Sequence, residues 1–440
     1  MKKKFFALLL VLLFAIGSVI AVQAKEKTII DDSKELFKQV QLFADSLTLI
    51  STDYVKPIKV KDLVYGAIRG MMDTLDGYSQ FLDPESFKEI TEETKGEFGG
   101  LGIEIGVRDG ILTVIAPIEG TPAFKVGLQA GDRIVKIEDE TTQDMTINDA
   151  VKKLRGDPGT KVKITVVREE TEEVLDFTIT RAIIKVKSIR EVELIEDDIG
   201  YIKIIEFQER TAKDLKKTIK GLEKKGAKGF ILDVRNNPGG LLDASVYTAD
   251  LFLEPGDMVV YTEGRDPEKR IEFKAKDKTE FSGLDLIVLV NKGTASAAEI
   301  LAGAIKDNKR GLVVGVTTFG KGSVQTVIPL KDKSALRLTT ASYFTPTGKN
   351  ISEKGIEPDV YVERKKLQKK EKKKKEKGIF QRLEKEGRIP KPKKKKKEEE
   401  EKPKEYDNQL KTAISILKGL QIYEGYKTPP VEEKTEKDES

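Results

Sequence analysis

The chain of 440 residues contains no histidine, no cysteine and no tryptophan. Without histidine or cysteine it cannot build a Ser-His-Asp triad, a Cys-His pair, a disulfide or the usual zinc sites. We therefore expect no metal site. Any nucleophilic catalysis would need a different base, and lysine is the obvious remaining side chain.

An excess of one charge is missing as well. The 79 Lys and Arg residues nearly balance the 74 Asp and Glu residues, which leaves a net charge of +5. This balance argues against a nucleic-acid-binding protein. Charge is concentrated in residues 366–404, a Lys/Glu-rich low-complexity tract that we expect to be solvated. A tether to nucleic acid or anionic lipid is the less favoured alternative, because the acidic run largely neutralises the basic runs.

The N-terminus has the pattern of an export signal. Lys2, Lys3 and Lys4 precede an almost unbroken apolar run over residues 5–22, and small residues stand at Val22 and Ala24. This pattern predicts a signal peptide over residues 1–24. An uncleaved membrane anchor over residues 5–22 is the alternative. Both interpretations place the rest of the chain outside the cytoplasm, in the periplasm or cell envelope.

Hydrophobic patterning divides the remainder of the chain. Residues 25–95 have apolar side chains at helical spacing, and residues 96–181 are rich in glycine and short β-branched runs. Residues 182–365 alternate apolar strands with helices, which predicts an α/β core of mixed sheet and helices. Residues 405–440 indicate a C-terminal amphipathic helix and a disordered tail. The predicted fold class is multi-domain α/β, with an inserted β-rich domain and helical N- and C-terminal segments.

The first candidate catalytic residue is Ser296. It lies in the segment Asn291–Glu299, between the apolar run Leu284–Val290 and a predicted helix. A helix N-terminus offers free backbone N–H groups and a positive dipole end, which favour a developing oxyanion. On this segment alone, a helix N-cap is the commoner role for a serine.

The second candidate is Lys321, which has a glycine on each side and lies between apolar strands over 311–316 and 324–330. Burial in a cleft would lower its pKa and make it a usable base. Gln325 would orient its amine through a hydrogen bond. The alternative is a solvated lysine on a surface turn, which is commoner.

The same segment partly fits a phosphate-binding loop. Gly315 to Lys321 has the spacing G-x-x-x-x-G-K, but Gly322 stands where that loop needs Ser or Thr. A helix should follow, whereas residues 324–328 have the composition of a strand. We therefore reject ATP binding.

The third motif, Asp233–Gly240, ends a predicted buried strand with Pro-Gly-Gly. Such a turn exposes backbone N–H groups. The N–H of Gly239 or Gly240 would therefore complete an oxyanion hole. A simple loop is the alternative for this motif alone.

Together the three motifs resemble those of the carboxyl-terminal processing peptidases, relatives of the bacterial tail-specific protease. That family has D-[LV]-R-x-N-x-G-G, then a nucleophilic serine in G-x-[AS]-S-A-[AS]-E, a lysine 25 residues later and a glutamine four beyond, as in this sequence. The resemblance covers about residues 30–365, and the lysine-rich tract departs from the common pattern. It implies that Ser296 is the nucleophile, Lys321 its base and Gln325 the residue that positions the lysine. It also implies an oxyanion hole and no cofactor; the oxyanion donors would be Gly239 or Gly240, and Ala297.

Residues 96–181 resemble a PDZ domain. The segment Gly99–Ile103 matches its carboxylate-binding loop, and Gly127–Ile134 is also typical of such domains. The resemblance implies that a substrate tail adds as a strand beside Ile103, with its last side chain in an apolar pocket. Arg155 matches a position that links the PDZ domain to the core, with an ordinary surface charge as the alternative. The residues predicted to bind the tail are Gly100, Leu101, Gly102 and Ile103.

The sequence thus predicts an exported serine endopeptidase that recognises apolar C-terminal tails of proteins. Its expected partners are protein substrates and a second copy in a homodimer, with no nucleic acid, and with a membrane only if the signal segment is uncleaved. The main alternative is a non-catalytic PDZ scaffold that binds tails. Ser296, Lys321 and Gln325 argue against the scaffold, because tail binding needs none of them.

Overall fold

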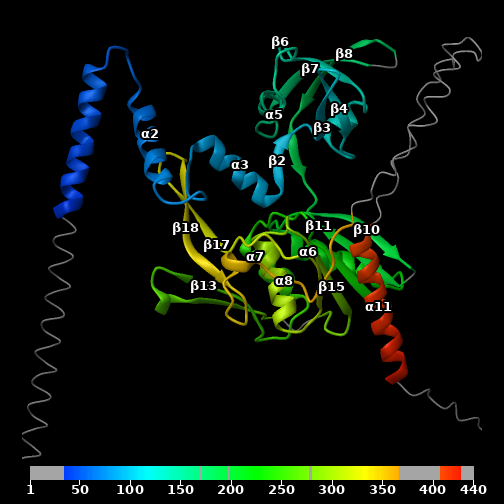
Figure 1. Ribbon diagram of the computed structural model, residues 1–440. Helices are drawn as coiled ribbons and strands as arrows, with labels where there is room; N and C mark the ends of the chain where they lie inside the picture. Colours follow the sequence, from blue (N-terminus) through cyan, green and yellow to red (C-terminus); the bar gives the residue numbers. More distant parts are fainter. Residues whose placement is uncertain (1–33, 169–170, 197, 277–279, 366–406, 428–440) are drawn as a thin grey trace, which may run out of the picture. The chain divides into compact units, whose positions relative to one another are not determined.

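The computed structural model divides the chain into two compact units, residues 1–84 with 327–338 and residues 85–326 with 339–440. The predicted signal peptide, the Lys/Glu-rich tract and the end of the tail lie outside the described residues (Figure 1). Among the helices that are described, none is long and apolar enough to cross a membrane. The structure describes residues 34–168, 171–196, 198–276, 280–365 and 407–427.

The first unit is mainly helical, in agreement with the predicted N-terminal segment. A helix over residues 34–53 is followed by α2 (Val60–Asp73) and the short strand β1 (Gln80–Leu82). β1 pairs antiparallel with the first residues of β18 (Ala335–Phe344). Tyr65, Met72 and Phe81 form the small core of this unit, packed by Ile68, Leu330, Leu336 and Leu338.

A β-rich domain begins the second unit. Its sheet has the order β3-β4-β5-β7-β8, with β6 beside β5 and β3 at one edge. Alternating side chains of these strands, such as Ile134, Ile164 and Val166, are fully buried in one core. The elements are β3 (Ile103–Arg108), β4 (Ile111–Pro117), α4 (Pro122–Lys125), β5 (Arg133–Ile137), β6 (Glu140–Thr141), α5 (Ile147–Leu154), β7 (Lys161–Val167) and β8 (Val174–Thr180).

A two-stranded stem connects this domain to the rest of the second unit. After α3 (Pro84–Lys95), β2 (Glu97–Gly100) enters the domain, and β9 (Ala182–Lys185) leaves it. The two strands pair antiparallel, from Glu97 opposite Lys185 to Gly100 opposite Ala182. The chain therefore enters and leaves the β-rich domain side by side, as an insertion requires. The sequence analysis did not predict this pair.

The α/β core is built on a six-stranded sheet of order β10-β11-β12-β15-β16-β19. β10 is antiparallel to β11, and the other neighbours are parallel. The strands are β10 (Ile189–Ile195), β11 (Ile199–Ile204), β12 (Gly229–Asp233), β15 (Asp285–Val290), β16 (Leu312–Gly315) and β19 (Val360–Tyr361).

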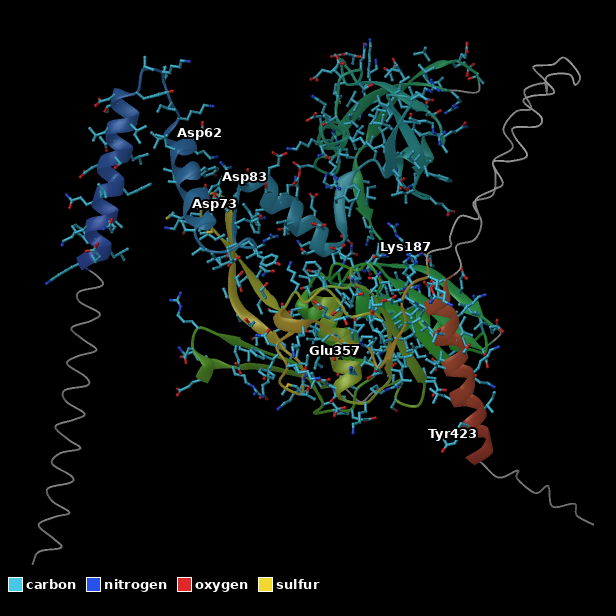
Figure 2. The ribbon with its side chains drawn as sticks, in the orientation of Figure 1. Asp62, Asp73, Asp83, Lys187, Glu357 and Tyr423 are labelled. Carbon is cyan, nitrogen blue, oxygen red and sulfur yellow. The ribbon has the colours of Figure 1, made fainter. Side chains whose placement is uncertain are left out.

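Helices cover both faces of this sheet, so its central strands β12 and β15 are almost entirely buried and largely apolar. Val288 packs in the core formed with α6 (Thr211–Glu223), α7 (Leu242–Asp250) and α8 (Ala297–Asp307). Leu289, on the other face, packs in the cluster that contains Ala413 and Leu417 of α11 (Asn408–Lys427). α11 is the predicted C-terminal helix and carries Tyr423 near its end (Figure 2).

A further sheet contains β13, β14, β17 and the later part of β18, whose first residues pair with β1. β13 pairs antiparallel with β14 and with residues 341–344 of β18, and β17 also pairs with β18. The predicted multi-domain α/β class is confirmed. The remaining elements are β13 (Met258–Gly264), η1 (Pro267–Lys269), β14 (Ile271–Lys274), β17 (Ser323–Pro329) and α9 (Ile351–Lys354).

Candidate active site

The three predicted motifs follow the carboxyl ends of three neighbouring strands. β12 leads into the turn 234–240, β15 leads into the loop that ends at Ser296, and β16 leads into the loop with Lys321. These strands are adjacent and parallel, so their carboxyl ends meet at one edge of the sheet. Open α/β sheets bind ligands at this edge. The fold therefore gathers motifs that are far apart in the sequence.

Ser296 lies at a sharp turn between β15 and α8. Its backbone has φ 54° and ψ −119°, an uncommon conformation for a residue with a side chain. Such strain is typical of functional sites. Ala297 is the first residue of α8, so its N–H has no acceptor within the helix. The serine is at the predicted strand-to-helix turn, in the N-cap position.

The buried carboxylate of Glu299 joins the serine turn to the lysine loop. Its Oε2 accepts the N–H groups of Ser296 at 2.8 Å and Lys321 at 2.9 Å. Its Oε1 accepts the Gly320 N–H at 2.7 Å and the Thr318 hydroxyl. The backbone amides of the two predicted catalytic residues thus lie within two hydrogen-bond lengths of each other. The sequence analysis placed Glu299 only within the serine motif and assigned it no role.

The turn 234–240 lies directly against the serine. Gly239 has φ 112°, and a Cβ built on it would lie only 2.8 Å from the Cβ of Ser296. Only glycine allows this approach without strain. The Ala295 N–H donates to the carbonyl of Asn237 at 2.9 Å. The chain before Ser296 is thereby hydrogen-bonded to the turn.

The two glycines of this turn differ in their hydrogen bonding. The Gly239 N–H donates to Oδ1 of the buried Asn237 at 2.8 Å. Gly240 is exposed, and its N–H has no acceptor within the part of the chain that the structure describes. Gly240 is therefore the glycine whose N–H is open to a substrate.

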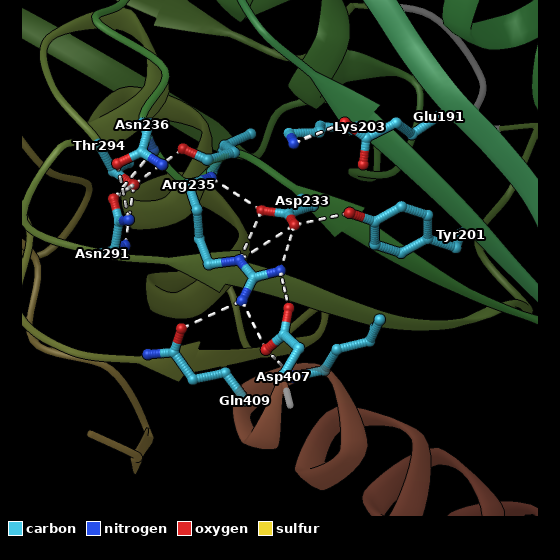
Figure 3. Close-up of polar contacts among 12 residues, drawn as sticks. Glu191, Tyr201, Lys203, Asp233, Arg235, Asn236, Asn291, Thr294, Asp407 and Gln409 are labelled. Carbon is cyan, nitrogen blue, oxygen red and sulfur yellow. Dashed lines mark hydrogen bonds and ion pairs between the residues drawn. The ribbon is translucent and has the colours of Figure 1, made fainter. Parts of the chain in front are cut away.

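Polar side chains fasten the turn to the loop after β15. Asn291 Oδ1 accepts the Asn236 N–H, and Asn291 Nδ2 donates to Asn236 Oδ1, both at 2.9 Å (Figure 3). The hydroxyl of the buried Thr294 donates to the carbonyl of Val234 at 2.8 Å. These bonds restrain the backbone on either side of the site.

Arg235 extends from this turn into a network of acidic side chains (Figure 3). Its guanidinium binds Asp233, with Nε 2.9 and 3.0 Å from the two carboxylate oxygens, and also binds Asp407. Burial alone would lower the pKa of Arg235, but the hydrogen bonds that Arg235 donates to Asp233 and Asp407 raise its pKa above the usual value. Burial and the neighbouring Asp233 raise the pKa of Tyr201, whose hydroxyl donates to Asp233 at 2.8 Å. Arg235 therefore stays charged and Tyr201 neutral.

Lys321 is partly buried in the loop between β16 and β17. A strand follows it, whereas a phosphate-binding loop requires a helix, so the rejection of ATP binding is supported. Gln325 lies in β17, and its Nε2 donates to Ser323 Oγ at 2.7 Å. The amide of Gln325 is thus held near the lysine loop.

The predicted tail-binding loop joins β2 to the edge strand β3. Leu101 is buried in the domain core. Gly102 has φ 79°, and a Cβ on it would lie 2.3 Å from that of Thr121. Neither the Leu101 nor the Gly102 N–H donates to an acceptor among the described residues. Gly100 ends β2 and Ile103 begins β3, whose outer edge is unpaired in the sheet.

Arg155 lies directly after α5, and its guanidinium stacks 4.3 Å from the ring centroid of Phe98 in β2. It therefore touches the stem that connects the β-rich domain to the core.

Comparisons with known proteins agree with this architecture. Residues 198–362 match the family model of peptidase family S41, residues 113–168 a PDZ domain, and residues 16–86 the N-terminal domain of the activating protease CtpB. A carboxy-terminal-processing protease of Bartonella bacilliformis is 43% identical over 337 residues, 76% of this chain and 77% of that protein.

Two further matches carry related names. The carboxy-terminal processing protease CtpA of Bacillus subtilis is 39% identical over 315 residues, 71% of this chain and 67% of that protein. The solved structure of a photosystem II D1 C-terminal processing protease is 30% identical, with a TM-score of 0.43, covering 73% of this chain and 92% of that one.

An α/β core with a peptidase family match, together with a PDZ domain, defines a serine-type peptidase that carries a peptide-binding module. The chain belongs to the carboxy-terminal processing protease family.

Proposed function

We propose that this protein is an exported endopeptidase that cuts proteins with apolar C-terminal tails by means of Ser296 and Lys321. The observation that carries the proposal is the gathering of the three motifs at neighbouring strand ends, where Glu299 accepts the backbone N–H groups of both residues. A scaffold that only binds tails has no need of this arrangement.

In the proposed reaction, Ser296 Oγ attacks the scissile carbonyl while neutral Lys321 takes the hydroxyl proton. The oxyanion accepts hydrogen bonds from the N–H groups of Ala297 and Gly240. The Gly239 N–H could replace that of Gly240 if its hydrogen bond to Asn237 breaks. Lys321 then gives the proton to the leaving amine as the peptide bond breaks. Water then attacks the acyl-enzyme, and Lys321 takes a proton from this water and returns it to Ser296 Oγ as the ester bond breaks. Gln325 positions the lysine amine. No metal or cofactor takes part.

The PDZ domain would select the substrate. The open N–H groups of Leu101 and Gly102, with Gly100 and Ile103 on either side, would donate hydrogen bonds to the terminal carboxylate of the substrate. The tail would add as a strand along the free edge of β3. Arg155, stacked on Phe98, would couple tail binding to the core.

We also propose an extracytoplasmic location, from the signal pattern of residues 1–24, and a homodimer. The dimer is supported by the helix over 34–53, where large apolar side chains remain exposed. They include Leu36, Phe37, Val40, Phe43 and Ile50, which are 45% to 70% exposed.

The test compares the chain from residue 25 with its Ser296→Ala variant. Each is incubated with an unstructured protein ending in small apolar residues, and with the same protein ending in Asp-Asp. We expect fragments by mass spectrometry only from the apolar-tailed substrate and only with Ser296 present. Binding of the tail by both forms without any cleavage would instead support the scaffold.

A further inference from the structure

Arg235 is held from two sides in a buried network (Figure 3). On one side is Asp233, at the end of β12, with 1% of its side chain exposed. On the other is Asp407, which lies directly before α11 and accepts Nη1 at 2.9 Å and Nη2 at 2.7 Å. The exposed fractions are 11% for Arg235 and 27% for Asp407, so solvent screens this pair little.

The first turn of α11 is built around this contact. Asp407 Oδ1 also accepts the Leu410 N–H at 3.0 Å and so caps the helix. The side chain of Gln409 is almost fully buried: its Oε1 accepts Arg235 Nη1 at 3.1 Å, and its Nε2 donates to the Val362 carbonyl at 2.8 Å. Asp407 and Gln409, at the N-terminus of α11, therefore both accept hydrogen bonds from the Arg235 guanidinium.

The guanidinium belongs to the turn that touches the nucleophile. The Arg235 N–H donates to Asp233 Oδ1 at 2.9 Å, Asn236 has φ 59°, and Gly239 approaches Ser296. A shift of the Arg235 side chain would move this turn, because only three residues lie between Arg235 and Gly239. Small displacements of a catalytic group are costly in rate.

We propose that Asp407 and Gln409 are positioning residues of the peptidase reaction: through Arg235 they hold the turn 235–240 against Ser296. This inference rests on the proposed function. In this proposal α11 contributes to catalysis by positioning the turn, although it follows the Lys/Glu-rich tract in the sequence.

The charges make this role separable from folding. Removal of Asp407 leaves Arg235 paired with Asp233, so no buried charge loses its only partner. Burial opposes ionisation of Asp407, but hydrogen bonds from Arg235 and the Leu410 N–H outweigh it and hold the pKa of Asp407 below its ordinary value. The carboxylate is therefore charged at neutral pH, where the reaction would be measured.

The experiment compares Asp407→Ala, Asp407→Asn and Gln409→Ala with the parent chain, using the apolar-tailed reporter protein. The control is Lys418→Ala on the same helix, which removes an exposed pair with Glu196. We expect Asp407→Ala to lower kcat about tenfold, with KM within about twofold. The kcat of Asp407→Asn, which keeps one acceptor oxygen, should lie between those of Asp407→Ala and the parent. The kcat of Lys418→Ala should match that of the parent.

A second readout does not need activity. In the Ser296→Ala background, Asp407→Ala should speed amide hydrogen exchange across residues 234–240 about tenfold, and more than across β12 and β15, with the protein still folded at the assay temperature. Parent-like kcat with unchanged exchange would overturn the inference, as would a loss of kcat that only follows loss of folded protein. If the parent cuts no reporter, the proposed function fails, and the exchange readout alone decides the positioning role.

Discussion

At the scale of single residues, the site depends on a carboxylate that does not react. Glu299 is fully buried and accepts four hydrogen bonds, from the serine turn and from the lysine loop. A carboxylate suits this position because it offers acceptors only. A glutamine of the same size would turn an NH₂ group toward at least one N–H donor.

We therefore predict that Glu299→Gln lowers the free energy of unfolding by about 2 kcal/mol or more, since buried donors lose their acceptor. kcat should fall about 10²-fold, because the serine and lysine loops lose their shared contact. Urea denaturation and steady-state kinetics measure the two effects. The exposed Glu193→Gln is the control and should change neither. A parent-like kcat in Glu299→Gln would refute this role.

At the scale of elements, the turn after β12 needs glycine for two separate reasons. Gly239 has a positive φ, and any Cβ added to it would also lie within contact distance of Ser296. Gly256 has φ 96° with no atom near its Cβ position, so it offers the strain without the contact.

We predict that Gly239→Ala lowers kcat at least about 10²-fold, because the new methyl displaces Ser296. Gly256→Ala should keep the parent kcat and lose only about 1–2 kcal/mol of stability from backbone strain. Kinetics and thermal unfolding of the two variants distinguish these effects. Equal activity losses would show that strain, rather than the contact, is responsible.

The docking of α11 should depend on pH. The folded-state pKa of Asp407 lies below its ordinary value, so this carboxylate stabilises the native state above the unfolded pKa of about 3.9. The stabilisation is lost as pH falls through the lower, folded-state pKa. We predict that Asp407→Asn is less stable than the parent at pH 7, by about 1–3 kcal/mol, and that the gap narrows by pH 3. A gap that stays constant in urea titrations at the two pH values would contradict this.

Much of the fold and site could be predicted from local patterns. The apolar runs predicted β12, β15 and β16, and the motif spacing predicted which residues follow them. β10 was not predicted, because most of its side chains are exposed and show no alternation. The pairing of Arg235 with Asp407 was not predictable either, since 172 residues separate them and no local pattern encodes such a contact. The open N–H of Gly240, as opposed to the engaged one of Gly239, also required the structure.

At the scale of the whole molecule, the helix over residues 34–53 presents an apolar stripe to solvent. Val40 and Phe43 are 56% and 45% exposed and lie on one face of the helix. Exposed apolar patches of this kind mark protein contacts. In the proposed homodimer this stripe meets its copy.

We predict that the double variant Val40→Glu and Phe43→Glu shifts the protein from dimer to monomer in sedimentation velocity. Burying two carboxylates at an apolar contact is unfavourable. Gln41→Glu, which adds a charge away from the stripe, should remain dimeric. A monomeric parent would exclude the proposed dimer.

The central claim is that Lys321 is the base for Ser296. The most direct measurement is kcat/KM on the apolar-tailed reporter for the parent and for Lys321→Ala, with Lys292→Ala as control. Lys292 is an exposed lysine of the serine loop. The account predicts a loss of at least about 10³-fold in kcat/KM for Lys321→Ala and full activity for Lys292→Ala. Activity of Lys321→Ala within about tenfold of the parent would contradict it.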